Sequence, residues 1–267
     1  MTNNYADING TRFYYEMAGK GQPLVLVHAA IADGRMWDEQ FHVFAQRYQV
    51  IRYDRRGFGR TPMAAGTYSH HQDLVDLLKF LNIERASFVG CSQGARIVVD
   101  LTLEHPEMTQ TIVLVSPSLS GFTFSGEQPR QAAQIDQAEE AGDIAQVNEL
   151  ELQIWVDGPH RTPEQVNPAV RERVREMNLI TLQTPADLGT EQPLTPPAAD
   201  RLGEIRTPAM VIVGDLDTPR TLATADHLAR NIAGAQKWII SGTAHMPNME
   251  KPAEFSQLVL SFLSSQA

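Results

Sequence analysis

The sequence contains very little cysteine and no long apolar run. Cys91 is the single cysteine among 267 residues, so no disulfide can form within the chain and an oxidising compartment is not required. The first ten residues lack the basic start and the apolar stretch of a signal peptide. No segment approaches the roughly 18 apolar residues that a membrane-spanning helix needs. We therefore expect a soluble, cytoplasmic protein.

Positive charge is also scarce. Asp and Glu number 32 against 22 Lys and Arg, which gives a formal net charge of −10. Binding to nucleic acid or to an anionic membrane needs clustered cations, so neither is expected as a partner. The densest basic cluster is interrupted by Asp54 and two glycines, which favours a structural loop; its members are Arg52, Arg55, Arg56 and Arg60.

Short β-rich runs alternate with amphipathic helical patterns along most of the chain. The sequence leaves a monomer and a homodimer open. Several runs are continuously apolar, which is typical of strands covered on both faces in a parallel sheet. The alternation predicts a doubly wound α/β fold with right-handed crossovers. The predicted strands are 24–27, 50–53, 86–89, 111–115, 210–213 and 236–240, with an antiparallel edge strand near 11–17. The predicted helices are 93–105, 220–231 and 252–264, with one more starting at Ser69 in a capping box with Gln72.

The alternation stops between residues 121 and 197, where no convincing strand pattern occurs. Helical patterns and a proline-rich stretch take its place; the helical patterns lie near 129–141, 143–156 and 163–180. Roughly 75 residues is long for a crossover connection. The segment therefore predicts a helical cap (121–197) inserted into an α/β core (1–120 and 198–267). Ordinary crossover helices of a single domain are the alternative.

A glycine-flanked serine follows the predicted strand 86–89. The pentapeptide 90–94, GCSQG, matches G-x-S-x-G and has Ser92 at its centre. Its position between an apolar strand and a helix is typical of a nucleophile elbow, a strained turn that exposes the serine hydroxyl above the sheet. Glycines are needed on both sides because strand and helix approach too closely there for side chains. The alternative, a phosphate-binding turn, lacks the P-loop lysine and the G-x-G-x-x-G spacing.

A serine hydroxyl is a weak nucleophile until a base removes its proton, so a histidine must come from elsewhere in the chain. His245 lies in a loop directly after the predicted strand 236–240, at the sheet edge where ligands bind. The loop after the preceding strand offers two acids, Asp215 and Asp217. Asp217 is favoured because the following Thr218-Pro219 places it in a turn toward the next helix. Asp215 is expected to accept hydrogen bonds from the loop backbone.

Acyl transfer also requires N–H donors for the oxyanion, each worth roughly 3 kcal/mol. One expected donor is the backbone N–H of Gln93, the residue after the nucleophile. The other is expected from the loop after the strand 24–27, where position favours Ala30. Cys91, next to the nucleophile, is expected to point back into the sheet as a small buried residue.

These motifs give nearly the whole chain a resemblance to the α/β-hydrolase superfamily. Within it, the chain resembles bacterial capped serine esterases, enol-lactonases and cofactor-free haloperoxidase-type hydrolases. The matching segments are 53–61 (YDRRGFGRT), 90–94 (GCSQG), 214–217 (GDLD) and 242–245 (GTAH). The resemblance implies an α/β-hydrolase fold, with a mostly parallel sheet of about eight strands and an inserted helical cap.

The resemblance also bears on single residues. It selects Asp217 as the acid by its distance from Gly214. Ser92 argues against haloalkane dehalogenases and epoxide hydrolases of the same family, which use an aspartate at the elbow. Such proteins usually carry His-Gly where this chain has His28-Ala29, and His28 is expected to shape its loop rather than to catalyse.

The combined prediction is hydrolysis of a small-molecule carboxylic ester or lactone by Ser92, His245 and Asp217 through an acyl-enzyme, with no metal and no organic cofactor. Carbon–carbon hydrolysis of a vinylogous diketone is an alternative from the same fold. A ligand-binding or regulatory protein that keeps the triad is the alternative from another class. The apolar residues expected to line the substrate pocket, although packing alone explains each of them singly, are Ile31, Phe122, Phe124, Trp155, Met177 and Met246.

Overall fold

The chain folds around one eight-stranded sheet whose larger part is parallel. The computed structural model describes residues 2–185 and 188–266. The strands are β1 (Thr2–Ile8), β2 (Thr11–Ala18), β3 (Pro23–Val27), β4 (Gln49–Tyr53), β6 (Ala86–Cys91), β7 (Thr109–Val115), β9 (Ala209–Gly214) and β10 (Gln236–Ile240). Their order is β1-β2-β4-β3-β6-β7-β9-β10, with β1 and β2 antiparallel to their neighbours and the others parallel. This arrangement confirms the fold class that the sequence predicts.

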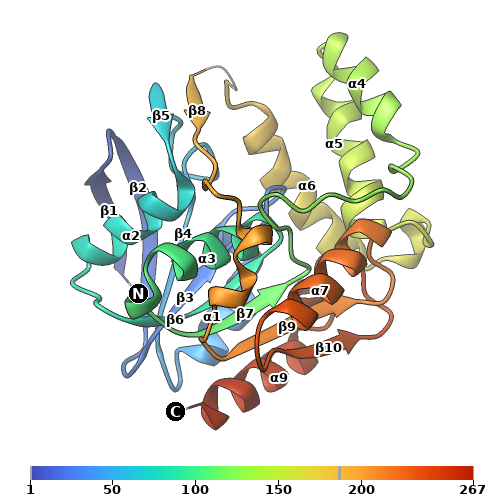
Figure 1. The fold of residues 1–267 in the computed structure, drawn as a ribbon. Coiled ribbons are helices and arrows are strands. Elements are labelled where there is room, and N and C mark those ends of the chain that lie inside the picture. Colours follow the sequence, from blue (N-terminus) through green and yellow to red (C-terminus); the bar gives the residue numbers. More distant parts are fainter. Residues whose placement is uncertain (1, 186–187, 267) are drawn as a thin grey trace.

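Helices cover both faces of the sheet (Figure 1). One face carries α2 (His70–Phe80), α3 (Gln93–Glu104) and α7 (Pro219–Asn231); the other carries α1 (Asp38–Phe44) and α9 (Pro252–Ser265). The predicted helices 93–105, 220–231 and 252–264 are confirmed to within one residue at each end. None of the helices in the described part of the chain is long and apolar enough to cross a membrane.

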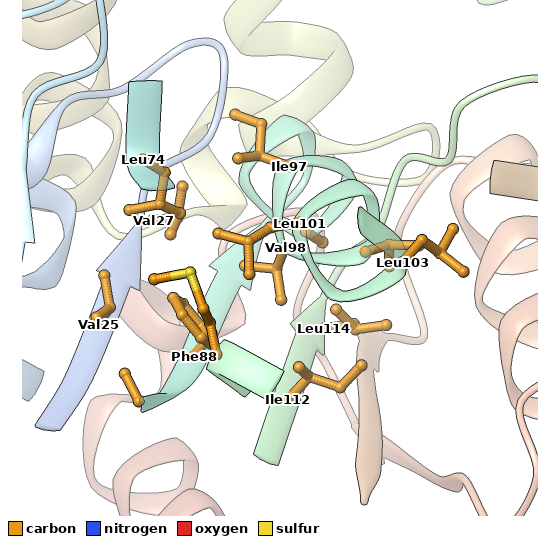
Figure 2. Packing of buried hydrophobic residues seen from close by; sticks show 14 of the residues in the cluster. Val25, Val27, Leu74, Phe88, Ile97, Val98, Leu101, Leu103, Ile112 and Leu114 are labelled. Atoms are coloured by element: carbon orange, nitrogen blue, oxygen red, sulfur yellow. The ribbon is translucent and has the colours of Figure 1, made fainter. Parts of the chain in front are cut away.

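Apolar packing between the sheet and α3 fixes where the first turn of α3 lies. Figure 2 shows this packing, with labelled side chains from β3 (Val25, Val27), β6 (Phe88), β7 (Ile112, Leu114), α2 (Leu74) and α3 (Ile97, Val98, Leu101, Leu103). Removing side chains of this size from water contributes about 1.5–3 kcal/mol each. The start of α3 is thereby held against the ends of β3 and β6.

Between β7 and β9 the chain forms α4 (Ala132–Glu140), α5 (Ile144–Leu152) and α6 (Pro168–Leu182), which stand together above the sheet in Figure 1. α5 continues directly into a π-helical turn, Gln153–Asp157. The predicted helix 163–180 starts too early, because Pro163–Gln165 forms a separate 3₁₀ turn. The division of the chain into a core and a cap stays a prediction.

Two expectations about strands are wrong. The strand predicted near 11–17 is β2, which lies between β1 and β4 and is not at the edge of the sheet. The segment 121–197 is not free of strands, because β8 (Gly189–Glu191) pairs in parallel with β5 (Gly66–Tyr68). Strands of three residues are too short to show an alternating apolar pattern.

The predicted capping box at the start of α2 is also wrong. Ser69 is the N-cap residue, but its side chain makes no capping hydrogen bond. Its Oγ contacts Nδ1 of His71 at 2.8 Å, and the Gln72 amide donates to Asp76 at 3.0 Å. Both side chains form hydrogen bonds with other side chains of the helix rather than with its free backbone N–H groups.

Two glycines allow β6 and α3 to meet. A Cβ added to Gly90 would overlap the backbone of Gly94, and one added to Gly94 would overlap the carbonyl oxygens of Val27 and His28. The close approach predicted for the GCSQG segment is therefore confirmed. It brings the first turn of α3 against the end of β3.

We predict that Gly94→Ala lowers the free energy of unfolding by about 1–3 kcal/mol, the usual cost of overpacking, because backbone atoms cannot move aside easily. Gly203→Ala is the matched control, since nothing lies within 4 Å of a Cβ built there. Urea denaturation of the purified variants measures both changes. Equal stability of the two variants would show that the helix can shift away from β3.

Candidate active site

Ser92 occupies the strained turn between β6 and α3. Its backbone has φ 55° and ψ −115°, a conformation that side-chain-bearing residues rarely adopt. Such a residue costs about 1–3 kcal/mol and persists only when its surroundings hold it. The N–H of Ser92 donates to the Val115 carbonyl at 2.8 Å. The Ser92 carbonyl accepts from Ser118, both from its N–H at 3.2 Å and from its Oγ at 3.1 Å. The loop after β7 thus holds the turn in place.

His245 and Asp217 form a buried pair. Nδ1 of His245 lies 3.0 Å from Oδ1 and 2.9 Å from Oδ2 of Asp217. The side chains are 4% and 0% exposed, so little water competes for the contact. Oδ1 of Asp217 also accepts the N–H of Thr218 at 2.7 Å. Among the described residues, Nε2 of His245 has no hydrogen-bond partner, and Ser92 Oγ is not hydrogen-bonded to it.

Asp215 and Asp217 have different partners. Asp215 accepts the backbone N–H of Gly242 at 2.5 Å, which is the loop-bracing role expected from the sequence. Asp217 is buried against the imidazole of His245. Asp215 therefore orders the loop, whereas Asp217 contacts the histidine.

The loop that carries His245 is tied to the segment after α5. The N–H of His245 donates to the Trp155 carbonyl at 3.3 Å, and the two rings lie 4.7 Å apart. Arg161 donates to the carbonyl of Val156 at 2.7 Å and forms an ion pair with Glu250. Glu250 in turn accepts the N–H of Ala244, next to His245, at 2.8 Å. The π-helical turn therefore helps to set the position of the imidazole.

The two backbone N–H groups expected to bind an oxyanion are free of acceptors. Among the described residues, neither Ala30 nor Gln93 donates its N–H to another group. Gln93 is the first residue of α3, where N–H groups lack a partner within the helix and carry partial positive charge. Ala30 lies in the turn after β3, the strand that Gly94 contacts closely.

His28 is locked in place as a neutral ring. Its Nε2 accepts the backbone N–H of Arg55 at 2.9 Å, so the proton must be on Nδ1, which lies 2.8 Å from the Ala29 carbonyl. Burial, followed by the positive charge of Arg55, holds the pKa of His28 well below its usual value. This fits the loop-shaping role expected for His28. Ala29 needs no left-handed backbone, so a methyl group is tolerated where glycine is usual.

Of the six residues expected to line the pocket, Ile31, Met177 and Met246 belong to one buried apolar cluster, and Trp155 packs against it. Met177 and Met246 have no exposed surface and belong to the apolar cluster on the α1 and α9 face. Phe122 packs toward α7, with its ring 5.1 Å from that of His227. Phe124 and Trp155 do meet, in the wall of a cavity of about 370 Å³. Ile31 lies buried beside Ala30.

A cysteine nucleophile and a metal centre are the other chemical candidates to consider. Cys91 is fully buried, as expected, and burial raises the pKa of its thiol well above the usual range. In the described residues, no group of three or more His, Cys, Asp or Glu side chains is placed to hold a metal ion.

Comparison with known proteins identifies the family. The sequence model of the α/β hydrolase fold matches residues 22–252. The chain belongs to the α/β hydrolase family. Further relatives named as enol-lactonase, methyl ester esterase and putative non-heme chloroperoxidase confirm the resemblance drawn from the sequence. The chain is a hydrolase of this family.

Relatives of the chain cover almost its whole length. It is 26% identical to the putative carbamate hydrolase RutD of Rhizobium rhizogenes, over 95% of this chain and 98% of that protein. It is 26% identical to 2-hydroxy-6-oxo-6-(2'-aminophenyl)hexa-2,4-dienoic acid hydrolase of Metapseudomonas resinovorans, over 98% and 91%. Its fold matches that of Est816, described as an N-acyl homoserine lactone degrading enzyme, with a TM-score of 0.78 and 27% identity over 97% of this chain and 100% of that one.

Several residues that order the site are missing from the sequence-based prediction. Ser118, Arg161 and Glu250 act through contacts between segments far apart in the chain, and no local motif marks them. Arg55 stands in a cluster that the sequence suggests is structural. Its neighbour Arg56 does form a buried ion pair with Asp73, but nothing in the sequence separates the two arginines.

We predict that Asp217→Asn lowers kcat by about 10³- to 10⁴-fold, because an amide holds the wrong imidazole tautomer and cannot stabilise imidazolium. Asp215→Asn should lower kcat by at most about tenfold, since it weakens one loop hydrogen bond worth roughly 1 kcal/mol. Steady-state ester hydrolysis by the two folded variants compares them directly. If Asp215→Asn is the inactive variant, the acid is at 215.

Proposed function

We propose that the chain is a serine hydrolase that cleaves a carboxylic ester or a lactone through an acyl-enzyme. Ser92 is the nucleophile, His245 the general base and Asp217 the acid that orients it. The backbone N–H groups of Gln93 and Ala30 form the oxyanion hole.

The His245–Asp217 contact is the observation that carries the proposal. With Nδ1 engaged by both carboxylate oxygens, only Nε2 can accept a proton from a nucleophile. The buried carboxylate compensates the positive charge that the ring gains when it does so. The strained turn at Ser92 supports the same proposal, because backbone strain of this kind is concentrated at functional sites.

The proposed reaction proceeds in two steps. Ser92 Oγ attacks the carbonyl carbon while its proton passes to Nε2 of His245, and the carbonyl oxygen becomes an oxyanion bound by two N–H groups. Collapse of this intermediate releases the alcohol with the proton from His245 and leaves an acyl-Ser92 ester. Water, deprotonated by His245, then attacks the acyl carbon; the acyl–Oγ bond breaks, the carboxylic acid is released, and His245 returns the proton to Ser92 Oγ. Contacts between catalytic groups are often loose before substrate binds, which is consistent with the free Ser92 hydroxyl.

The cavity beside Trp155 supports a substrate with both apolar and polar parts. Its apolar lining consists of Phe124, Pro129, Ile154, Trp155, Pro159 and Pro219, and its polar lining of Glu127, Gln128, Arg130, Gln131, Gln153, Thr218 and Arg220. Trp155 is part of the cavity wall and contacts the ring of His245. We therefore assign the choice of substrate to residues 121–197, which we propose to act as a cap over the core.

Carbon–carbon hydrolysis is the second candidate function. The relative from Metapseudomonas resinovorans is named as a hydrolase of a 2-hydroxy-6-oxo-dienoic acid, a compound that has no ester bond. The same groups of this chain are available for that reaction. Turnover of a simple ester and of such a dienoic acid, compared at equal enzyme concentration, separates the two candidates.

We predict that Ser92→Ala lowers ester turnover by about 10⁴-fold or more, because no other nucleophile is available at the turn. A fluorophosphonate should modify the unaltered protein at Ser92, as detected by mass spectrometry of its peptides. Multiple turnovers of a p-nitrophenyl ester are expected as well. Modification of Cys91 in place of Ser92, or a single turnover with retained product, would contradict the proposal.

We predict that Trp155→Ala changes the order of preference among p-nitrophenyl esters of increasing acyl length, because it opens the wall of the cavity beside His245. The ratio of kcat/KM between long and short esters should change by about tenfold, the value of one or two methylene contacts in an apolar pocket. Trp238→Ala on β10, where the side chain is largely exposed, is the control. A uniform loss for all esters would assign Trp155 to positioning His245 alone.

A further inference from the structure

Arg55 is a fully buried arginine without a carboxylate partner. Within the described residues, no Asp or Glu oxygen forms an ion pair with its guanidinium, and Nε has no acceptor at all. The other buried arginines of the cluster are compensated, Arg52 by Glu16 and Arg56 by Asp73. Burial lowers the pKa of Arg55 to about 10, so the group still carries its charge at neutral pH. Burying a charge without an opposite charge beside it costs free energy. The contacts that Arg55 does make therefore indicate what its charge stabilises.

The hydrogen bonds of the guanidinium lead to the two loops that carry the proposed oxyanion hole. Nη1 donates to the side-chain oxygen of Gln93 at 2.6 Å, and Nη2 donates to the Ala29 carbonyl at 3.1 Å. The backbone N–H of Arg55 donates to His28 at 2.9 Å. The ring of Phe58, with its centre 4.1 Å from the guanidinium carbon, covers one face of the charge.

The Ala29 carbonyl belongs to the same peptide unit as the Ala30 N–H. In a planar trans peptide these two groups point in opposite directions. The carbonyl accepts from Arg55, from Nδ1 of His28 at 2.8 Å and from the N–H of Ala32 at 3.3 Å. Donors that converge on the oxygen fix the plane of the peptide, and with it the direction of the Ala30 N–H. A positive charge on the carbonyl side also polarises the peptide, which strengthens its N–H as a donor.

We propose that Arg55 is the positioning residue of the oxyanion hole. Resting on the proposed function, this assigns the guanidinium two tasks. It aims the Ala30 N–H through the Ala29 carbonyl, and it holds the Gln93 side chain away from the nucleophile. Arg55 is fully buried and, in the described part of the chain, forms no hydrogen bond with Ser92, so its effect is exerted on the transition state through these two loops.

The test compares Arg55→Met, which keeps most of the apolar length but loses the donors, with the unaltered protein. Substrate turnover is measured with p-nitrophenyl butyrate, and the oxyanion hole is probed by inhibition with an alkyl trifluoromethyl ketone. Such a ketone forms a tetrahedral adduct with the serine, whose oxyanion needs the same donors. We expect kcat to fall by about 10²-fold, the effect of removing one oxyanion donor. KM should change little, and the inhibition constant of the ketone should rise in parallel with the loss in kcat.

Arg56→Met is the matched control, since Arg56 is buried in the same loop but paired with Asp73. It should lower the melting temperature while leaving kcat and ketone inhibition of the folded protein unchanged. If Arg55→Met does not fold, Arg55→Lys decides: one flexible donor cannot serve both acceptors, so kcat and ketone affinity should again fall together. A folded Arg55 variant that loses only stability, with kcat and ketone inhibition unchanged, overturns the proposal. Absence of fluorophosphonate labelling at Ser92 in the unaltered protein would instead overturn the proposed function itself.

Discussion

The close approach of α3 to the ends of β3 and β6 is the constraint on which the site depends. Gly90 and Gly94 remove the side chains that would keep the helix away from the sheet. Because the helix starts so near β3, the chain must turn sharply at Ser92, and its backbone takes a strained conformation. The same approach brings the free N–H of Gln93 beside the loop of Ala30. One packing contact thus accounts for the strained turn at Ser92 and for the position of Gln93 near the end of β3.

Electrostatics around this turn follow from burial rather than from net charge. The chain is acidic overall, yet Arg55 is fully buried and has no carboxylate partner among the described residues. Its guanidinium donates hydrogen bonds to the Ala29 carbonyl and to the Gln93 amide oxygen. Asp217 is the opposite case, a buried carboxylate facing an imidazole that can become charged. Both groups hold polar partners in fixed directions, which is the condition for stabilising charge that develops during a reaction.

The segment between β7 and β9 takes part in ordering the histidine. Trp155 contacts His245 through its ring and its carbonyl, and Arg161 links the same turn to Glu250. The π-helical turn therefore connects the wall of the cavity to His245. Under the proposed function, a change in that wall also affects the imidazole, so specificity and rate are coupled.

The sequence by itself determined the six parallel strands of the sheet, the helices α3, α7 and α9, the serine turn and Asp217 as the partner of His245, because each depends on local patterns or on strand order. It missed β1 and placed β2 at the edge of the sheet. It did not reveal β5 and β8, whose three residues are too short for a pattern, nor the partners of Ser69. Only the tertiary structure decided that Phe124 and Trp155 share a cavity while Met177 and Met246 lie in the core. It also separated Arg55 from Arg56, because a buried charge is defined by what distant segments place beside it, and one of these arginines faces Asp73 while the other does not.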